Sequence, residues 1–171
     1  MTIRSAPLQS TGMKKNHSAA PQKKTVEWFV DQCARVGIKA TQQRRQIFDA
    51  LSRSMDHPDA ECIYKQVRKK IPAISLDTVY RNLHTLEKHG IIQRAGTPDS
   101  RARYDANTDM HHHFVCVECG LITDFTDSSL DKYRPPKNIS MAGEIRRLRI
   151  ELHGRCSRCA SADKQNKTRT M

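Results

Sequence analysis

The chain has 171 residues and a formal net charge of +12 at pH 7. Its length suits one medium domain or two small ones, and its charge favours a polyanionic partner, nucleic acid ahead of a membrane surface. Solvated lysines and arginines on an ordinary basic protein are the simpler interpretation of charge alone. No apolar run approaches the roughly 20 residues of a membrane-spanning helix, and no signal-peptide core follows the basic start of the chain. We therefore expect a cytoplasmic protein with no membrane partner.

Four helices are predicted before residue 90. Apolar side chains recur at helical spacing over residues 26–36, and Gly37 can end this first helix. Each of the next three helices follows a residue that can accept hydrogen bonds from the free amides of a helix N-terminus, namely Thr41, Asp59 and Ser75. The third helix stops before Pro72, and the fourth ends at Gly90.

A two-stranded hairpin is predicted directly after these helices. Residues 91–95 and 101–105 have strand-like patterns, and the turn-forming sequence Gly-Thr-Pro-Asp-Ser separates them at 96–100. Helices followed by a small hairpin are the order of elements in a winged helix-turn-helix. We assign this domain to residues 25–104 and expect residues 1–24 to form a disordered basic tail.

The second half of the chain predicts an α/β module. Residues 113–125 resemble a hairpin that is interrupted around Cys116 and Cys119, and residues 127–133 predict a short helix. Two consecutive prolines, Pro135-Pro136, stop that helix.

A last strand is predicted over residues 147–152, where apolar and charged residues alternate. The side chains expected to face inward are Leu148, Ile150 and Leu152. We assign residues 105–160 to this second domain and residues 161–171 to a disordered tail. The fold class is therefore α+β, with a winged helix first and an α/β module second.

The fourth helix is the candidate for reading DNA. Its polar face, toward the N-terminal half where a recognition helix meets the major groove, carries Thr78, Tyr80, Arg81 and Asn82. Arginine and asparagine can pair with guanine and adenine edges, and threonine and tyrosine can contact thymine methyl groups or phosphates. Flanking phosphate or minor-groove contacts are predicted for Arg44, Arg45, Arg101 and Arg103. An ordinary amphipathic helix with a polar face is the alternative.

Four of the six cysteines form two Cys-x-x-Cys pairs, Cys116 with Cys119 and Cys156 with Cys159. In a reducing cytosol such pairs are metal ligands more often than disulfides. Two pairs complete a closed tetrahedral zinc site, which is structural rather than catalytic because protein fills every position. A thiol redox switch and unligated cysteines are the alternatives. The isolated cysteines, which we expect to be buried packing residues, are Cys33 and Cys62.

A second cluster of potential metal ligands lies between the two modules. His111 and His113 are two residues apart on an extended segment, so that both imidazoles point to the same side. The other candidates are His57, Asp105 and Asp124. If the modules pack so that these groups converge, three nitrogens and two carboxylates suit iron(II), manganese(II) or zinc. Taken singly, each of these residues can also be explained as an ordinary loop or strand-end residue. His112 is expected to point to the opposite side from its neighbours and to be solvated.

Several segments match a known family in order and spacing. They are Thr41-x-x-Arg44, His57-Pro58, Ser75-x-x-Thr78-Val79-Tyr80-Arg81-x-Leu83, Arg103-Tyr104-Asp105, His111-x-His113-x-x-Cys116-x-x-Cys119-Gly120 and Gly154-x-Cys156-x-x-Cys159. From about Val26 to Cys159 the chain resembles the ferric uptake regulator family of bacterial metalloregulators. The resemblance implies a homodimer on a double-stranded, palindromic operator, joined through the second module. It also implies one structural zinc per subunit on the four paired cysteines.

The resemblance implies one regulatory iron(II) or manganese(II) per subunit, with the ligands His57, Asp105, His111, His113 and Asp124. Within the family the chain is most similar to the peroxide-responsive branch, because iron-responsive members more often carry glutamate at the positions of Asp105 and Asp124. In that branch, peroxide oxidises a ligand histidine through the bound iron, which releases the metal and the DNA. The expected targets here are His57 and His111.

Two positions depart from the family pattern. Relatives often carry a further metal-binding histidine where this chain has Leu148, so we expect that extra site to be absent. Pro135-Pro136 interrupts a region where relatives often have a longer dimerisation helix, which leaves the geometry of the dimer open.

Three other functions compete with a peroxide-sensing repressor. The first is an iron- or zinc-responsive repressor of metal-uptake genes, built on the same fold. The second is a zinc-dependent hydrolase or deaminase, which would need a metal with an open position and a nearby general acid or base. The four-cysteine site is closed, so we predict no enzyme. The third is a basic zinc-binding interaction protein that is indifferent to a second metal.

Overall fold

The computed structural model describes residues 24–54, 56–96, 101–134, 136, 143–144 and 150–167. Residues 1–23 of the tail predicted over residues 1–24, the tip of the wing at 97–100 and the end of the chain at 168–171 lie outside the described residues. Among the described helices, none is long and apolar enough to cross a membrane.

The four predicted helices are present. They are α1 (Val26–Arg35), α2 (Gln42–Ser52), α3 (Ala60–Arg68) and α4 (Leu76–Lys88). The predicted caps of the last three are confirmed, because the side chains of Thr41, Asp59 and Ser75 each accept a hydrogen bond from a first-turn amide. Thr25 caps α1 in the same way. Local sequence therefore fixes where each helix begins.

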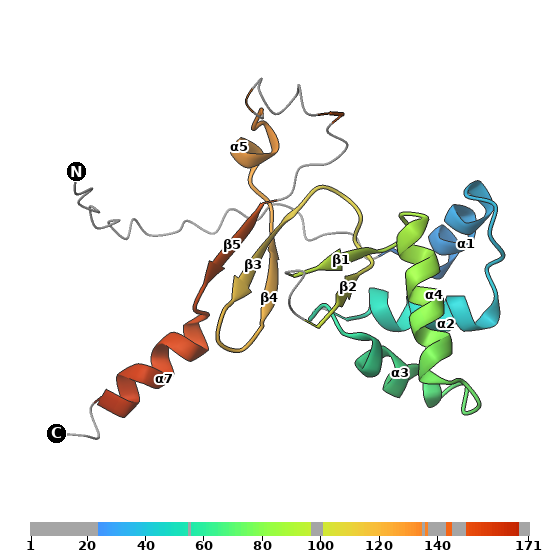
Figure 1. Ribbon diagram of the computed structural model, residues 1–171, viewed down its shortest axis with the longest axis horizontal. Coiled ribbons are helices and arrows are strands. Elements are labelled where there is room, and N and C mark those ends of the chain that lie inside the picture. The colour runs from blue at the N-terminus through green and yellow to red at the C-terminus, as the bar shows by residue number, and fades with distance from the viewer. Residues whose placement is uncertain are drawn as a thin grey trace.

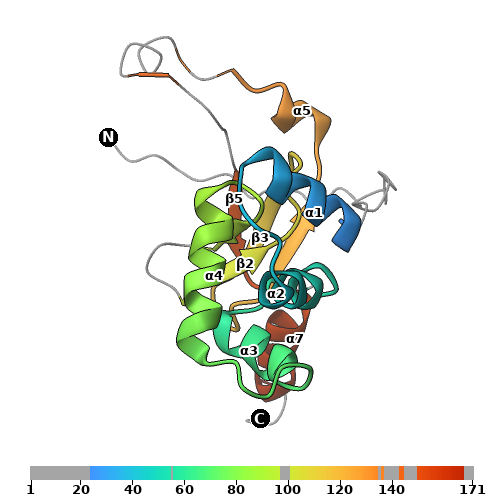
Figure 2. The same cartoon turned by 90° about the vertical axis from the view of Figure 1, so that its right-hand side faces the viewer.

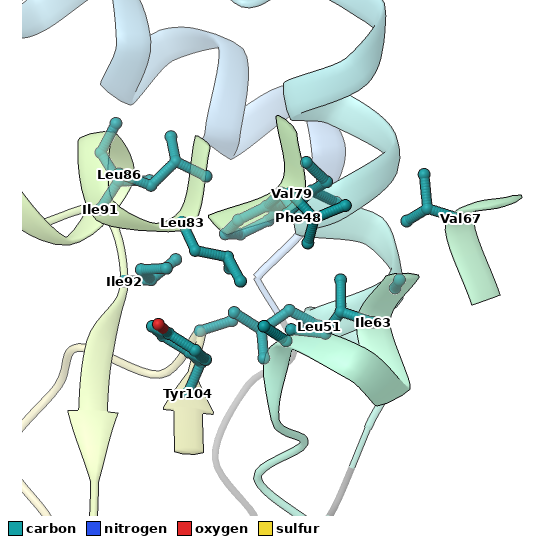
Figure 3. Close-up of a cluster of buried hydrophobic side chains, with 14 of the residues drawn as sticks. Phe48, Leu51, Ile63, Val67, Val79, Leu83, Leu86, Ile91, Ile92 and Tyr104 are labelled. Atoms are coloured by element: carbon teal, nitrogen blue, oxygen red, sulfur yellow. The ribbon is translucent and has the colours of Figure 1, made fainter. Parts of the chain in front are cut away.

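The apolar stripes of these helices meet in one core (Figure 3). Phe48 from α2, Ile63 from α3 and Leu83 from α4 have no exposed surface. The Phe29 ring of α1 stacks on Phe48 with the ring centroids 4.6 Å apart. Each such side chain contributes about 1.5–3 kcal/mol when it is fully removed from water, so the core holds α4 firmly while its polar face stays outside.

The wing follows as β1 (Gln93–Ala95) and β2 (Arg103–Asp105), which pair antiparallel. Both strands are shorter than predicted. The backbone amide of Tyr104 donates to the carbonyl of Pro58 at 3.1 Å, which attaches the wing to the loop before α3. The predicted domain boundary between residues 104 and 105 falls inside β2.

The second half contains a three-stranded sheet of β3 (His112–Cys116), β4 (Ile122–Phe125) and β5 (Glu151–Gly154). Its order is β4-β3-β5, with β3 and β4 antiparallel and β3 and β5 parallel. β5 begins later than predicted, and Leu152 is 48 % exposed rather than facing inward. The reason is that β5 packs mainly against β3, so that no described helix covers this side of the strand. Leu148 lies outside the described residues.

Two further helices belong to this half, α5 (Ser128–Asp131) and α7 (Ser157–Lys167). α5 matches the predicted short helix. α7 covers residues 161–167, where a disordered tail was expected, and the stretch is rich in the strong helix formers alanine, lysine and glutamine. Figure 1 shows the helices α1–α4 on one side, the three-stranded sheet on the other, and the wing strands between them. Figure 2, from the helical side, shows the sheet behind the helices.

Candidate metal centres

The two cysteine pairs meet at one end of the three-stranded sheet. Cys116 is the last residue of β3, and Cys119 lies in the turn that follows. Cys156 follows β5, and Cys159 lies in the first turn of α7. β5 runs parallel to β3 with Gly154 opposite Cys116, so the strand register brings the two pairs side by side.

The four sulfur atoms are spaced as tetrahedral zinc requires. All four lie within 4.8 Å of one another, and Sγ of Cys119 is 3.7 Å from Sγ of Cys156. Zinc–sulfur bonds of about 2.3 Å place two sulfurs of a tetrahedron about 3.8 Å apart. All four are free thiols rather than disulfides. The residues present therefore fit a closed zinc site.

Backbone amides stabilise the metal-binding form of two of these four thiols. The amides of Cys119 and Cys156 lower the pKa of Cys116 to about 6, and the second of them lies 3.3 Å from the sulfur. The amide of Leu121 lowers the pKa of Cys119, and the Arg158 guanidinium adds to that effect. Because the thiolate is the form that ligates metal, these contacts prepare Cys116 and Cys119 for a cation, whereas the neighbouring Cys156 and Cys119 thiols raise the pKa of Cys159.

The five predicted sensor residues come from three parts of the fold. His57 lies in the loop before α3, and Asp105 is the last residue of β2 in the wing. His111 directly precedes β3, His113 lies within β3, and Asp124 lies on β4. The antiparallel register places His113 opposite Asp124. The site is therefore shared between the winged helix and the sheet.

The ligand atoms of these five residues converge. The Nε2 atoms of His111 and His113 are 2.9 Å apart. Oδ2 of Asp105 lies 3.0 Å from Nε2 of His111 and 3.8 Å from Nε2 of His57. Oδ1 of Asp124 lies 3.0 Å from Nε2 of His57 and 3.3 Å from Nε2 of His113. The ligand atoms of His57, Asp105, His111 and His113 all lie within 4.8 Å of one another, and Asp124 borders this group through His57 and His113.

Two of these atoms have unmet bonding capacity. Nε2 of His57 and Oδ1 of Asp124 are buried and, although they lie 3.0 Å apart, neither forms a hydrogen bond of suitable geometry. A buried polar atom without a partner costs about 1–3 kcal/mol, and a divalent cation would give both atoms a ligand bond. The donor set of imidazoles and carboxylates fits iron(II), manganese(II) or zinc.

Neighbouring groups hold two of the ligands in place. The Gln93 side-chain amide donates to Oδ2 of Asp105 at 3.0 Å, and the Asn107 backbone amide donates to Oδ1 at 2.7 Å. Nδ1 of His111 lies 2.8 Å from the carbonyl oxygen of Asp109. A carbonyl can only accept, so Nδ1 carries the proton and Nε2 is left with a free lone pair for a metal.

The charges of the site are also set by its contacts. Burial alone would raise the pKa of Asp105, but the neighbouring His111 imidazole and the hydrogen bonds from Gln93 and the Asn107 amide lower it. Burial likewise opposes the lowered pKa of Asp124, which results from the imidazoles placed beside it. Both carboxylates are therefore ionised at neutral pH and ready to bind a cation.

Gln93 and Asn107 were missed by sequence analysis. The available signal for Gln93 was a polar residue at an inward position of a strand, since β1 alternates buried, exposed, buried. The available signal for Asn107 was its position two residues after Asp105. An aspartate side chain commonly accepts a hydrogen bond from the backbone amide at that spacing.

Gln93→Met should weaken metal binding about 10-fold or more, because partners that orient a metal ligand contribute about 10–100-fold to affinity. The measurement is an anaerobic manganese(II) titration of zinc-loaded protein, with Arg94→Gln on the neighbouring exposed residue as the control. Unchanged manganese affinity in Gln93→Met would show that the amide does not support Asp105.

Some of the side chains predicted to contact DNA are exposed at the surface. Tyr80 is 43 % exposed, and the exposed Arg81 forms an ion pair with Asp77 one helical turn earlier. Arg101, in the wing, forms ion pairs with Asp59 at 3.1 Å and with Glu61 at 3.4 Å. These side chains are accessible to a nucleic acid.

Asn82 is more constrained than predicted. Its side-chain oxygen accepts from Nε of Arg44 at 3.1 Å, and its amide nitrogen donates to the carbonyl of Thr78 at 2.8 Å. The Thr78 hydroxyl lies 2.8 Å from that of Ser75. To contact bases, Asn82 and Arg44 would have to exchange these bonds.

Two further expectations about single residues were wrong. His112 is fully buried rather than solvated, and its Nε2 lies 3.1 Å from Oδ1 of Asp131. Cys62 is exposed rather than buried, because its side of α3 faces away from the core that covers Cys33.

Comparisons with known proteins agree with this geometry. Residues 35–153 match the family model described as the ferric uptake regulator family. The peroxide-responsive repressor of Staphylococcus epidermidis is 34 % identical over 125 residues, which cover 73 % of this chain and 83 % of that protein. The Helicobacter pylori ferric uptake regulator has a TM-score of 0.65 at 26 % identity, covering 81 % of this chain and 95 % of that one. A Campylobacter jejuni peroxide stress regulator has a TM-score of 0.60 at 26 % identity, covering 78 % and 98 %. This chain therefore belongs to the ferric uptake regulator family.

Proposed function

We propose that this protein is a homodimeric, DNA-binding transcriptional repressor that holds DNA only with a divalent metal bound and that senses hydrogen peroxide. The observation that carries the proposal is the convergence of ligands from two halves of the fold. The winged-helix half provides His57 and Asp105, and the sheet half provides His111, His113 and Asp124. The S. epidermidis relative, named as a peroxide-responsive repressor, supports the signal.

The two donor sets are suited to different metals. The four thiolates suit one structural zinc per subunit, and the histidine–aspartate set suits one regulatory iron(II) or manganese(II). Iron(II) bound there would supply the redox chemistry by which hydrogen peroxide oxidises a ligand histidine, and manganese(II) would not. By position, His57 and His111 are the expected targets.

The chain's own residues link this site to DNA. The ligands meet in only one arrangement of the two halves, so metal binding favours that arrangement. His57 lies in the loop before α3, two residues before the N-cap Asp59, and α3 packs against α4. The arrangement of the halves therefore sets where the α4 helices of a dimer lie relative to each other. Loss of a ligand by oxidation removes the preference and releases the DNA.

The surface of α4 and the net charge of +12 support a DNA partner. We propose base contacts from the α4 face carrying Thr78, Tyr80, Arg81 and Asn82, with flanking contacts from Arg44 and Arg101. A two-fold dimer would read a palindromic operator, and the DNA partner places this function in the cytoplasm. The relatives are named as regulators, and we propose no catalytic turnover.

DNA selection tests this function. Zinc-loaded protein with added manganese(II) is incubated with a random-sequence duplex library, and the bound DNA is sequenced. We expect an inverted repeat whose half-sites are centred about 10 base pairs, or a multiple of that, apart. Affinity for it should fall when manganese is withdrawn while zinc stays bound. Equal affinity with and without manganese would contradict the proposal and indicate a basic zinc-binding protein without a sensor.

The alternative is an iron- or zinc-responsive repressor of metal-uptake genes. The fold similarity to the H. pylori ferric uptake regulator favours it. Aspartate at both carboxylate positions favours the peroxide signal instead. The two functions share every residue of the site, so only the response to peroxide separates them.

A further inference from the structure

His57 has an unusual backbone for a metal ligand. Its φ of 46° lies in the left-handed region, where it is the only non-glycine residue among those the structure describes. Side chains disfavour this conformation, and it persists where the surrounding structure holds it. Something in the fold must therefore hold the loop that carries His57.

The imidazole itself has no such support. The His57 side chain is 4 % exposed, and its Nδ1 atom is buried without a hydrogen-bond partner. By contrast, Nδ1 of His111 is fixed by the Asp109 carbonyl, and His113 sits in β3, the central strand of the sheet. The direction of the His57 ring therefore depends on its backbone and on packing, including the edge-to-face contact with the His113 ring, rather than on a hydrogen bond at Nδ1.

That backbone is bound to the wing at three successive carbonyl groups. The Arg103 guanidinium donates to the carbonyl oxygens of Asp56 and His57 through Nη2 and Nε. The amide of the next residue, Tyr104, donates to the Pro58 carbonyl at 3.1 Å. Asp105, itself a metal-site residue, follows directly on the same strand.

We propose that Arg103 is a positioning residue for the metal sensor. Its guanidinium holds the left-handed loop so that the His57 imidazole points at the same centre as Asp105. A planar guanidinium presents Nε and Nη2 in a fixed fork, which suits two neighbouring carbonyls and which lysine cannot reproduce. This inference rests on the proposed function of the site as a metal sensor.

The same geometry argues against the DNA contact that the sequence suggested for Arg103. Its guanidinium faces the loop before α3, and both of its contacts are to backbone carbonyls of this chain. Arg101, two residues earlier, is exposed and pairs with Asp59 and Glu61. It offers a matched control with the same charge on the same wing.

A cobalt(II) titration separates these roles. Zinc-loaded protein is titrated anaerobically, and both the affinity and the visible ligand-field spectrum of cobalt are recorded for Arg103→Met, Arg103→Lys and Arg101→Met. Both Arg103 variants should bind cobalt about 10–100-fold more weakly, with a spectrum that shifts toward that of His57→Ala. Arg101→Met should bind cobalt like the wild type.

A double-mutant cycle tests whether Arg103 acts through His57. In a His57→Ala background, Arg103→Met should cause no further loss of cobalt affinity. An equal loss of cobalt affinity in the wild-type and His57→Ala backgrounds would overturn the positioning role of Arg103. Wild-type cobalt affinity in Arg103→Met would overturn it as well, and weakened DNA binding of that variant at saturating metal would then indicate a DNA contact. If Arg103→Met does not fold, as judged by circular dichroism and zinc content, Arg103→Lys completes the cycle. A wild-type protein that binds no cobalt beyond its zinc would overturn the sensor function as well.

Discussion

Cys119→Ser should lose the structural zinc and unfold the second half of the protein. Structural zinc contributes an apparent binding free energy of about 10–16 kcal/mol to small domains at neutral pH, which is comparable to or larger than the stability of a typical domain, about 5–15 kcal/mol. Cys119 lies in the turn that joins β3 to β4. Loss of the zinc should therefore destabilise the strands that carry His113 and Asp124. Zinc analysis and circular dichroism give the measurement.

Cys62→Ser is the matched control, since Cys62 is exposed and lies outside the thiol cluster. It should keep full zinc content and stability. A Cys119→Ser protein that stays folded and dimeric at wild-type stability would contradict the structural role of the metal.

His57→Ala should keep its fold and its zinc but lose the dependence of DNA binding on the regulatory metal. Coupling between two sites is typically about 1–3 kcal/mol, or about 5–150-fold in affinity, and this enhancement should disappear. The reason is that His57 lies in the loop before α3, so its removal weakens the link from the metal to the DNA-binding half. Fluorescence anisotropy on selected DNA, with and without manganese(II), measures the effect.

His89→Ala is a suitable control for this variant, because His89 lies at the end of α4 outside the ligand cluster. It should keep the manganese enhancement. If His57→Ala bound DNA as tightly as the wild type in the presence of manganese, the bridge between the two halves would not be the switch.

The helices were predictable because their signals are local. Thr41, Asp59 and Ser75 cap helices within the next three residues, and apolar residues at helical spacing, such as Val79 and Leu83, are fully buried. No distant contact is needed to recognise such signals. The shorter strands and the helical residues 161–167 were less predictable, because sheet edges and helix extensions depend on neighbours outside the local sequence.

The sensor site could be predicted only in part. Spacing shows that His111 and His113 share a side of a strand, but it does not show that His57 lies beside them. That convergence depends on contacts such as Tyr104 to Pro58, 46 residues apart in the chain, and the sequence reached it only through family resemblance. For the same reason Gln93 was missed and Arg103 was assigned to DNA rather than to the metal site, since their hydrogen-bond partners are distant in sequence.

The response to peroxide is best measured on DNA. Zinc-loaded protein is charged anaerobically with iron(II) or with manganese(II), bound to a selected operator, and given a brief micromolar pulse of hydrogen peroxide. We expect only the iron form to release DNA, with oxygen added to His57 or His111 by mass spectrometry. If both forms keep their DNA and only chelation releases it, the protein reports metal supply and the peroxide function is wrong.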